Sequence, residues 1–87
     1  MSKSKYQKQE VPELYIKRLA YTGQLLQEYR RGSGMSRRDV EEVYGISRRT
    51  IERIERGHPI SVISLYRYAS CFGLEPSDLF FRDSEII

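Results

Sequence analysis

Residues 36–57 read SRRDVEEVYGISRRTIERIERG, and this stretch decides the fold. The triplet Ser-Arg-Arg occurs in it twice, at residues 36–38 and 47–49, and serine is a favoured residue for the cap that begins a helix. Gly45 lies between the two segments, and Gly57 with Pro59 ends the second one. The pattern predicts two short helices joined by a tight turn, which is a helix-turn-helix.

The arginines that directly follow both serines are unusual at the start of a helix. A helix N-terminus carries about half a positive charge, so a cation in the first turn costs from a few tenths up to about 1 kcal/mol. Local conflicts of this kind tend to mark sites where function opposes stability. A polyanion lying across both helix ends would remove the repulsion, and the obvious polyanion is DNA.

Apolar residues at helical spacing predict a long helix before this pair. Pro12 suits its first turn, and glycines at 32 and 34 end it. Gly23 predicts a weak point, because glycine costs about 1 kcal/mol inside a helix. The apolar stripe of this helix consists of Tyr15, Leu19, Thr22, Leu26 and Tyr29, with a narrower stripe of Ile16, Ala20 and Gly23.

The same spacing predicts which residues of the later segments face the core. A further helix begins at the cap Ser61, and a last short turn spans residues 76–81. No segment alternates polar and apolar residues over enough length to predict a strand, so the predicted fold is all-α. The inward positions are Val40, Val43 and Tyr44, then Ile46, Ile51 and Ile54, then Val62, Leu65, Tyr66, Ala69 and Phe72, and finally Leu79 and Phe80.

Length and charge predict one basic domain. The 87 residues, of which 39% are hydrophobic and 31% charged, are typical of a small soluble globular protein. Lys and Arg outnumber acidic residues by seven to three in residues 1–31 and by six to five in residues 32–57, but are outnumbered four to two in residues 58–87. The basic front half fits a partner that carries phosphate.

The expected organisation is a flexible basic tail at 1–11, a DNA-binding domain at 12–81 and a short tail at 82–87. The first tail is either a solvated terminus or an arm whose lysines contact DNA. No apolar run approaches the roughly 18 residues of a membrane span and no signal-peptide core follows Met1, so a cytoplasmic protein without membrane contact is predicted. With Cys71 and His58 each the single residue of its type, no disulfide, metal site, cofactor or enzyme activity is expected.

A family resemblance becomes specific along residues 34–57. The residues Gly34-Met35-Ser36, Val40, Tyr44-Gly45-Ile46-Ser47, Ile51, Ile54 and Glu55-Arg56-Gly57 resemble the helix-turn-helix of the lambda-repressor-like, or XRE/Cro-type, DNA-binding domains. Further matches at Leu65, Ala69, Phe72-Gly73-Leu74 and Leu79-Phe80 extend the resemblance over about residues 22–81. It implies a compact five-helix domain with a long first helix, and a third helix, at about residues 47–56, in the major groove of double-stranded DNA.

The resemblance also implies roles for individual residues. Arg37 is expected to hold phosphate or to reach an outer base, and Arg38 is expected to hold phosphate. Arg30 is expected to pair with Glu55. The residues expected to reach base edges or the backbone are Ser47, Arg48, Arg49, Thr50 and Arg53, and the arginines among them predict guanines in the bound sequence. The chain departs from the family pattern where Glu41 replaces a small alanine and Arg37 a glutamine.

The leading prediction is a homodimeric, sequence-specific transcription regulator, most simply a repressor. Its dimer contact is expected in the helix from Ser61 and the C-terminus, where apolar residues exceed what one small core can use: Ile63, Tyr66, Phe81, Ile86 and Ile87. The alternative is a protein-interaction module, such as an antitoxin, whose protein partner comes first and DNA second. A plainer reading of the arginines is a solvated helix face neutralised by Glu52 or Glu55.

Overall fold

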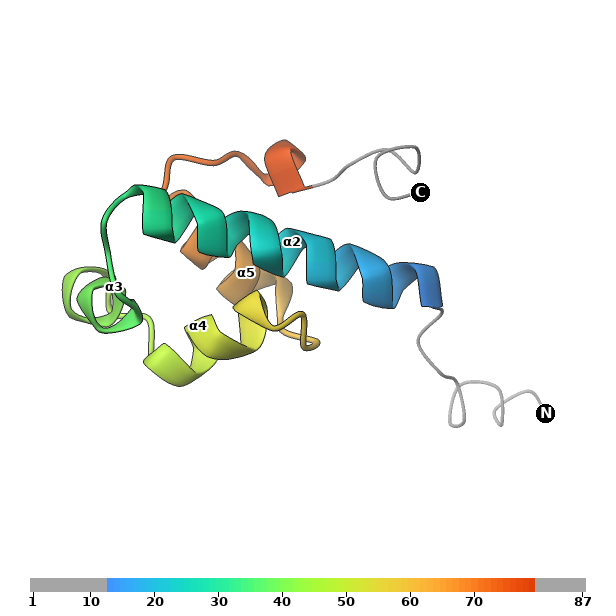
Figure 1. Ribbon diagram of the computed structural model, residues 1–87, viewed down its shortest axis with the longest axis horizontal. Coiled ribbons are helices and arrows are strands. Elements are labelled where there is room, and N and C mark those ends of the chain that lie inside the picture. Colours follow the sequence, from blue (N-terminus) through green and yellow to red (C-terminus); the bar gives the residue numbers. More distant parts are fainter. Residues whose placement is uncertain (1–12, 80–87) are drawn as a thin grey trace.

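The computed structural model describes residues 13–79, which fold into helices arranged around one core (Figure 1). These residues hold α2 (Glu13–Gly32), α3 (Arg37–Tyr44), α4 (Arg48–Glu55), α5 (Val62–Ser70) and a 3-10 turn, η1 (Pro76–Leu79), and no strand. The all-α prediction and the long first helix are confirmed. The five-helix count is corrected, because the described range holds four α-helices and η1. Both predicted tails, Pro12, Phe80 and Phe81 lie outside the described residues.

Serine caps fix where the three short helices begin. The side chains of Ser36, Ser47 and Ser61 each accept a hydrogen bond from the backbone N–H three residues later, at N···O distances of 3.0–3.2 Å. At α3, the Asp39 carboxylate in turn accepts a hydrogen bond from the Ser36 N–H, which completes a capping box. The helix starts predicted at these serines are confirmed. The first turn of α4 contains no acidic residue.

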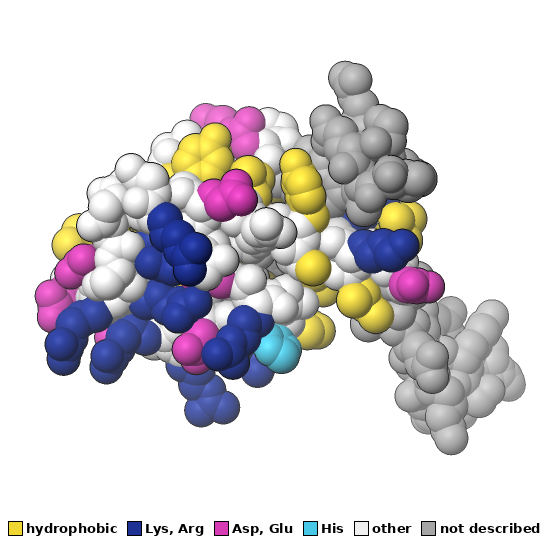
Figure 2. Space-filling model, viewed as in Figure 1, with side chains coloured by type: hydrophobic (Ala, Val, Ile, Leu, Met, Phe, Trp, Pro, Cys, Tyr) yellow, Lys and Arg dark blue, Asp and Glu magenta, His cyan; other side chains and the backbone are white. Residues whose placement is uncertain are grey.

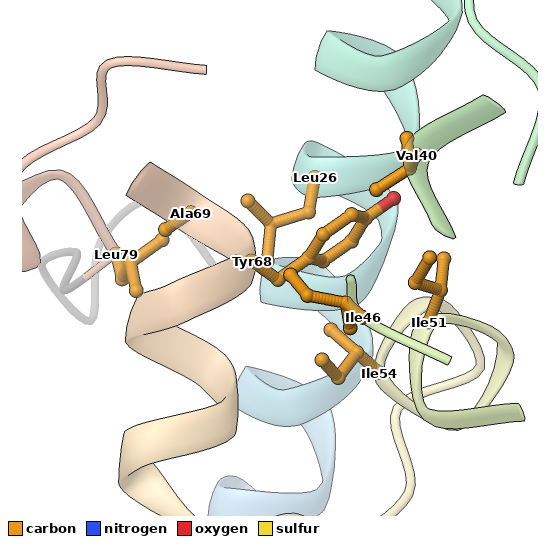
Figure 3. Packing of buried hydrophobic residues seen from close by; sticks show 8 residues of the cluster. All are labelled: Leu26, Val40, Ile46, Ile51, Ile54, Tyr68, Ala69 and Leu79. Atoms are coloured by element: carbon orange, nitrogen blue, oxygen red, sulfur yellow. The ribbon is translucent and has the colours of Figure 1, made fainter. Parts of the chain in front are cut away.

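The core collects one or a few side chains from every helix. Figure 3 shows the Tyr68 ring reaching from α5 in among Leu26 of α2 and three isoleucines of the α4 region. Tyr68 is fully buried and is among the largest buried side chains of the described range. Sequence spacing misses it, although it lies three residues after Leu65 and four before Phe72. The buried apolar residues are Leu26, Val40, Ile46, Ile51, Ile54, Tyr68, Ala69 and Leu79.

Several predicted inward positions are wrong. Val43 and Tyr44 at the end of α3 are exposed, as is Val62 at the start of α5. The eight-residue α3 lies at one end of the molecule (Figure 1), so that Val40 is its one buried residue. Tyr15 and Tyr29, near the two ends of α2, are likewise exposed. The predicted apolar stripe therefore runs further along each of these helices than the part of the helix that its neighbours cover.

Gly23 is a contact point and not a weak point of α2. A Cβ atom at this position would lie 2.2 Å from the carbonyl oxygen of Ile54 and 2.9 Å from that of Glu55, closer than real side chains approach. Gly57 meets Ala20 in the same region, where an added Cβ would lie 2.9 Å from the Ala20 Cα. The small residues of α2 thus let its backbone touch the C-terminal end of α4, and the helix continues unbroken through Gly23.

Candidate nucleic-acid interface

Arginine side chains gather over one face of the molecule, on α3 and α4 (Figure 2). Two acidic residues of these helices, Glu41 and Glu52, are half-buried, whereas most of the arginines extend into solvent. The exposed arginines of the two helices, together with the C-terminal cap of α4, are Arg38, Arg48, Arg49, Arg53 and Arg56. We call these five residues the arginine face.

Beneath this face, one buried carboxylate joins all four α-helices. Glu55 of α4 accepts hydrogen bonds from Arg30 of α2 at 2.7 and 3.1 Å, and the exposed fractions of the two side chains are only 1% and 8%. Arg37 at the start of α3 donates to the same carboxylate at 3.0 Å. Tyr68 of α5 donates its hydroxyl to the second carboxylate oxygen. The predicted pair of Arg30 and Glu55 is confirmed. We name Arg30, Arg37, Glu55 and Tyr68 the Glu55 cluster.

The ionisation states of the cluster follow from these bonds. Burial raises the pKa of Glu55, but hydrogen bonds from Arg30 and Tyr68 more than offset it, so the pKa lies below its ordinary value. Burial and the neighbouring Glu55 carboxylate raise the pKa of the Tyr68 hydroxyl. The hydrogen bond to Glu55 raises the pKa of Arg30. At neutral pH the cluster therefore combines an ionised carboxylate, charged arginines and a protonated phenol.

Arg37 occupies a position between the cluster and the surface. Its Nε and Nη2 atoms lie 3.0 Å from Glu55, its Nη1 atom lies 3.8 Å from Glu52, and 32% of the side chain is exposed. The sequence assigned this residue to DNA alone, as a contact to phosphate or to an outer base. In the structure it also ties the start of α3 to the end of α4, and so helps to set the angle of the helix-turn-helix.

The residues of the arginine face differ in how closely each one contacts other groups of the protein. Arg48 lies 2.9 Å from Glu41, whereas Arg38 lies 3.9 Å from Glu42. Arg53 donates to the Pro59 carbonyl at 3.2 Å and so touches the loop after α4. Arg49 is exposed and has no hydrogen bond or ion pair within residues 13–79. Its charge is the one most available to a ligand at the start of α4.

Ser47 and Thr50 are engaged with each other at the N-terminus of α4. The Ser47 hydroxyl accepts from the Thr50 N–H at 3.2 Å and donates to the Thr50 hydroxyl at 3.0 Å. Their side chains thus form the cap that places Arg48 and Arg49 on the first turn. The seven predicted site residues therefore lie on α3, α4 and the cap before α4, with Arg37 partly turned inward.

A family model described as helix-turn-helix matches residues 26–79, which is more than half of the chain. The chain belongs to this helix-turn-helix family. Its type is XRE or lambda-repressor-like, as the resemblance predicted, and its members are DNA-binding transcription regulators. No curated protein and no solved structure matches the chain.

Two contacts beside α4 were not foreseen from the sequence. The sequence marked Glu41 as a departure, but it gave no sign that this carboxylate reaches Arg48. Tyr68 was not considered as a partner of Glu55, because the predicted inward positions of its helix did not include it. Among the described helices, none is long and apolar enough to cross a membrane.

Proposed function

We propose that this protein is a homodimeric, sequence-specific repressor that places α4 in the major groove of double-stranded DNA. The observation that carries the proposal is Arg49, an exposed arginine without a partner in residues 13–79 on the first turn of a helix that has no acidic residue there. A cation at this end opposes the helix dipole, and an anionic ligand would relieve the conflict. With eight residues, α4 is about 12 Å long and suits a groove about 12 Å wide.

The proposed contacts divide into two kinds. Arg48, Arg49 and Arg53 read base edges, where arginine bonds bidentately to guanine. The groups proposed to hold phosphates and so fix the register are Arg37, Arg38, Ser47 and Thr50. The exposed position of Arg38 and the outward edge of Arg37 support this assignment.

Selection from random duplexes tests the proposal, followed by binding at several salt concentrations. Arg49→Ala should relax one position of the selected sequence, at a cost of about 1–3 kcal/mol for that base pair. Arg38→Ala should weaken binding to all sequences alike and lower the salt slope by about one. Arg67→Ala, an exposed arginine on α5, is the control and should change neither. Uniform weakening by both face variants would contradict the division of labour.

Exposed apolar residues on α5 support the proposed homodimer. Ile63 is 73% exposed and Val62 is also exposed, whereas Tyr66 is half-buried. Burial of such side chains against a second copy would remove apolar surface from water. Ile63→Glu should shift the protein from dimer to monomer in sedimentation equilibrium and weaken binding to a two-half-site duplex more than to a single half-site. A wild-type monomer at micromolar concentration would contradict the dimer.

The protein-interaction module remains the second candidate, and the first half of α2 favours it. Leu14, Tyr15 and Ile16 are exposed there, and α2 extends beyond α4 and α5 toward its N-terminal end (Figure 1). Such apolar side chains suit a protein partner. The selection experiment separates the two candidates, because an interaction module would show no selected duplex preferred over random DNA.

A further inference from the structure

The closest ion pair on the arginine face crosses the turn of the helix-turn-helix. Glu41 of α3 and Arg48 of α4 approach to 2.9 Å between Oε1 and Nε, and 37% and 57% of their side chains are exposed. The other surface pairs of these two helices, Arg37–Glu52, Arg38–Glu42 and Arg56–Glu52, are 3.8–3.9 Å apart. Among the residues that the structure describes, Glu41 is thus the carboxylate best placed to act on the arginine face.

The geometry of this pair leaves the reading edge of Arg48 open. Glu41 is closest to Nε, and neither Nη1 nor Nη2 has a hydrogen-bond partner within residues 13–79. A guanidinium carries five donors, so a carboxylate near Nε leaves the Nη pair available for guanine O6 and N7. The carboxylate therefore contacts the side chain at Nε and leaves the Nη atoms, which would meet a base, without a hydrogen-bond partner in residues 13–79.

We propose that Glu41 is a specificity-determining residue that orients Arg48 for base contact. The inference rests on the proposed function and deepens it. An arginine held in one direction loses less rotamer freedom on binding, which favours the matched base over others. The same carboxylate repels phosphates and weakens binding to every duplex. Glu41 thus trades general affinity for discrimination at one base pair.

Glu42 supplies a matched control, because it lies next to Glu41 on α3 and faces Arg38 at 3.9 Å without approaching Arg48. Glu41→Gln and Glu42→Gln remove the same charge, so both should raise affinity for random DNA to a similar degree. Discrimination at the base pair that Arg48→Ala relaxes should fall about 2- to 10-fold in Glu41→Gln alone, which corresponds to ordering one long side chain. Melting temperatures of both variants, compared with that of the wild type, serve as the check that they remain folded.

Two further variants test whether Glu41 acts through Arg48. Glu41→Asp keeps the charge but shortens the side chain by one methylene, so it should lose discrimination while random binding stays unchanged. In an Arg48→Ala background, Glu41→Gln should cause no further loss of discrimination. The loss of discrimination expected in these variants comes from the direction of Arg48 and not from the stability of α3. A purely structural role for Glu41 would therefore not produce this pattern.

Each outcome decides the matter. Equal discrimination in Glu41→Gln and Glu42→Gln, on a duplex that the wild type prefers, would overturn the inference and leave the proposed function standing. The same holds if Arg48→Ala relaxes no position, or if Glu41→Gln still lowers discrimination without Arg48. A selection that yields no preferred duplex would overturn the proposed function and the inference with it.

Discussion

Glu52 and Glu55 lie one turn apart on α4, yet their carboxylates have opposite surroundings. Glu52 is 43% exposed and meets Arg37 and Arg56 only at 3.8 Å. Glu55 is buried and accepts hydrogen bonds from Arg30, Arg37 and Tyr68. Exposed ion pairs contribute about 0–1 kcal/mol to the free energy of unfolding, because water screens them. Removal of one member of a buried pair is more costly, because it leaves the other charges buried and unpaired.

The difference separates architecture from recognition. The Glu55 cluster joins α2, α3, α4 and α5 at one point, and so fixes the orientation of α4. The arginine face above it contributes little to that orientation, which leaves its guanidinium groups available for a ligand. Substitutions in the two regions should therefore separate loss of stability from loss of binding.

The largest effect is expected from Glu55→Ala, compared with the same change at Glu52. Loss of Glu55 leaves Arg30 buried beside no carboxylate and should lower the free energy of unfolding by about 3–5 kcal/mol. Glu52→Ala should lower it by less than about 1 kcal/mol. Urea denaturation at pH 7 measures both. Similar losses for the two variants would show that the buried cluster has no special weight.

Gly23→Ala comes next, because it forces α2 away from the backbone of α4. The added methyl group would meet the Ile54 and Glu55 carbonyl oxygens, and overpacking of this kind costs about 3 kcal/mol at the upper end of its usual range. Gly32→Ala is the control, since nothing lies within 4 Å of its Cβ position, and it should be neutral or slightly stabilising. Thermal denaturation of the two variants tests the close approach, and a stable Gly23→Ala protein would contradict it.

Tyr68→Phe should cost about 2 kcal/mol, which is the usual contribution of a hydrogen bond to a charged group. Glu55 keeps its bonds to Arg30 and Arg37 in this variant, so the loss stays below that of Glu55→Ala. The matched control is Tyr66→Phe on the same helix, whose hydroxyl has no hydrogen bond within residues 13–79. Equal stability of both variants in urea would remove Tyr68 from the cluster.

Acid should destabilise the fold through the Glu55 carboxylate, whose pKa is lowered in the folded protein. The folded pKa of Glu55 lies below its ordinary value, so the unfolded chain takes up the proton first. Its stabilisation is complete above the unfolded pKa of about 4.3 and is lost as the pH falls through the folded pKa. A carbon-13 NMR titration of the Glu55 carboxyl should give a midpoint below about 4.3. A higher midpoint would mean that burial outweighs the hydrogen bonds.

The smallest effect is expected from Arg38→Ala. Its contact with Glu42 is long, and both side chains are largely exposed, so the free energy of unfolding should change by about 0.5 kcal/mol or less. The urea midpoint should therefore match that of the wild type, while DNA affinity falls. A loss above about 1 kcal/mol would erase the distinction between the face and the cluster.

Local chemistry could be predicted from the sequence, and the coverage of each helix by its neighbours could not. A serine cap acts within three residues of itself, which is why Ser36, Ser47 and Ser61 located the helix starts. Spacing identifies the residues that share a face, but the length of the covering helix decides whether Val43 or Val62 is buried. Both side chains are exposed in the structure, because the neighbouring helices do not cover them.

The candidate site shows the same limit. The resemblance predicted that Arg30 meets Glu55, because matching positions recur in the family, but it did not predict that Arg37 and Tyr68 share that carboxylate. Whether Gly23 weakens a helix or admits a neighbour depends on what lies opposite, and that is α4, some thirty residues later in the chain. Contacts between distant segments are what periodicity leaves out.

The shortness of α4 links folding to occupancy. Isolated helices below about 12–15 residues are marginal in water, and α4 has eight, so it persists only while its neighbours hold it. Any duplex that binds α4 consequently acts by mass action on the whole unfolding equilibrium, adding about 2.7 kcal/mol when the free duplex is at a hundred times its dissociation constant. Binding of the duplex and folding of the protein would then be linked equilibria, so that each one favours the other.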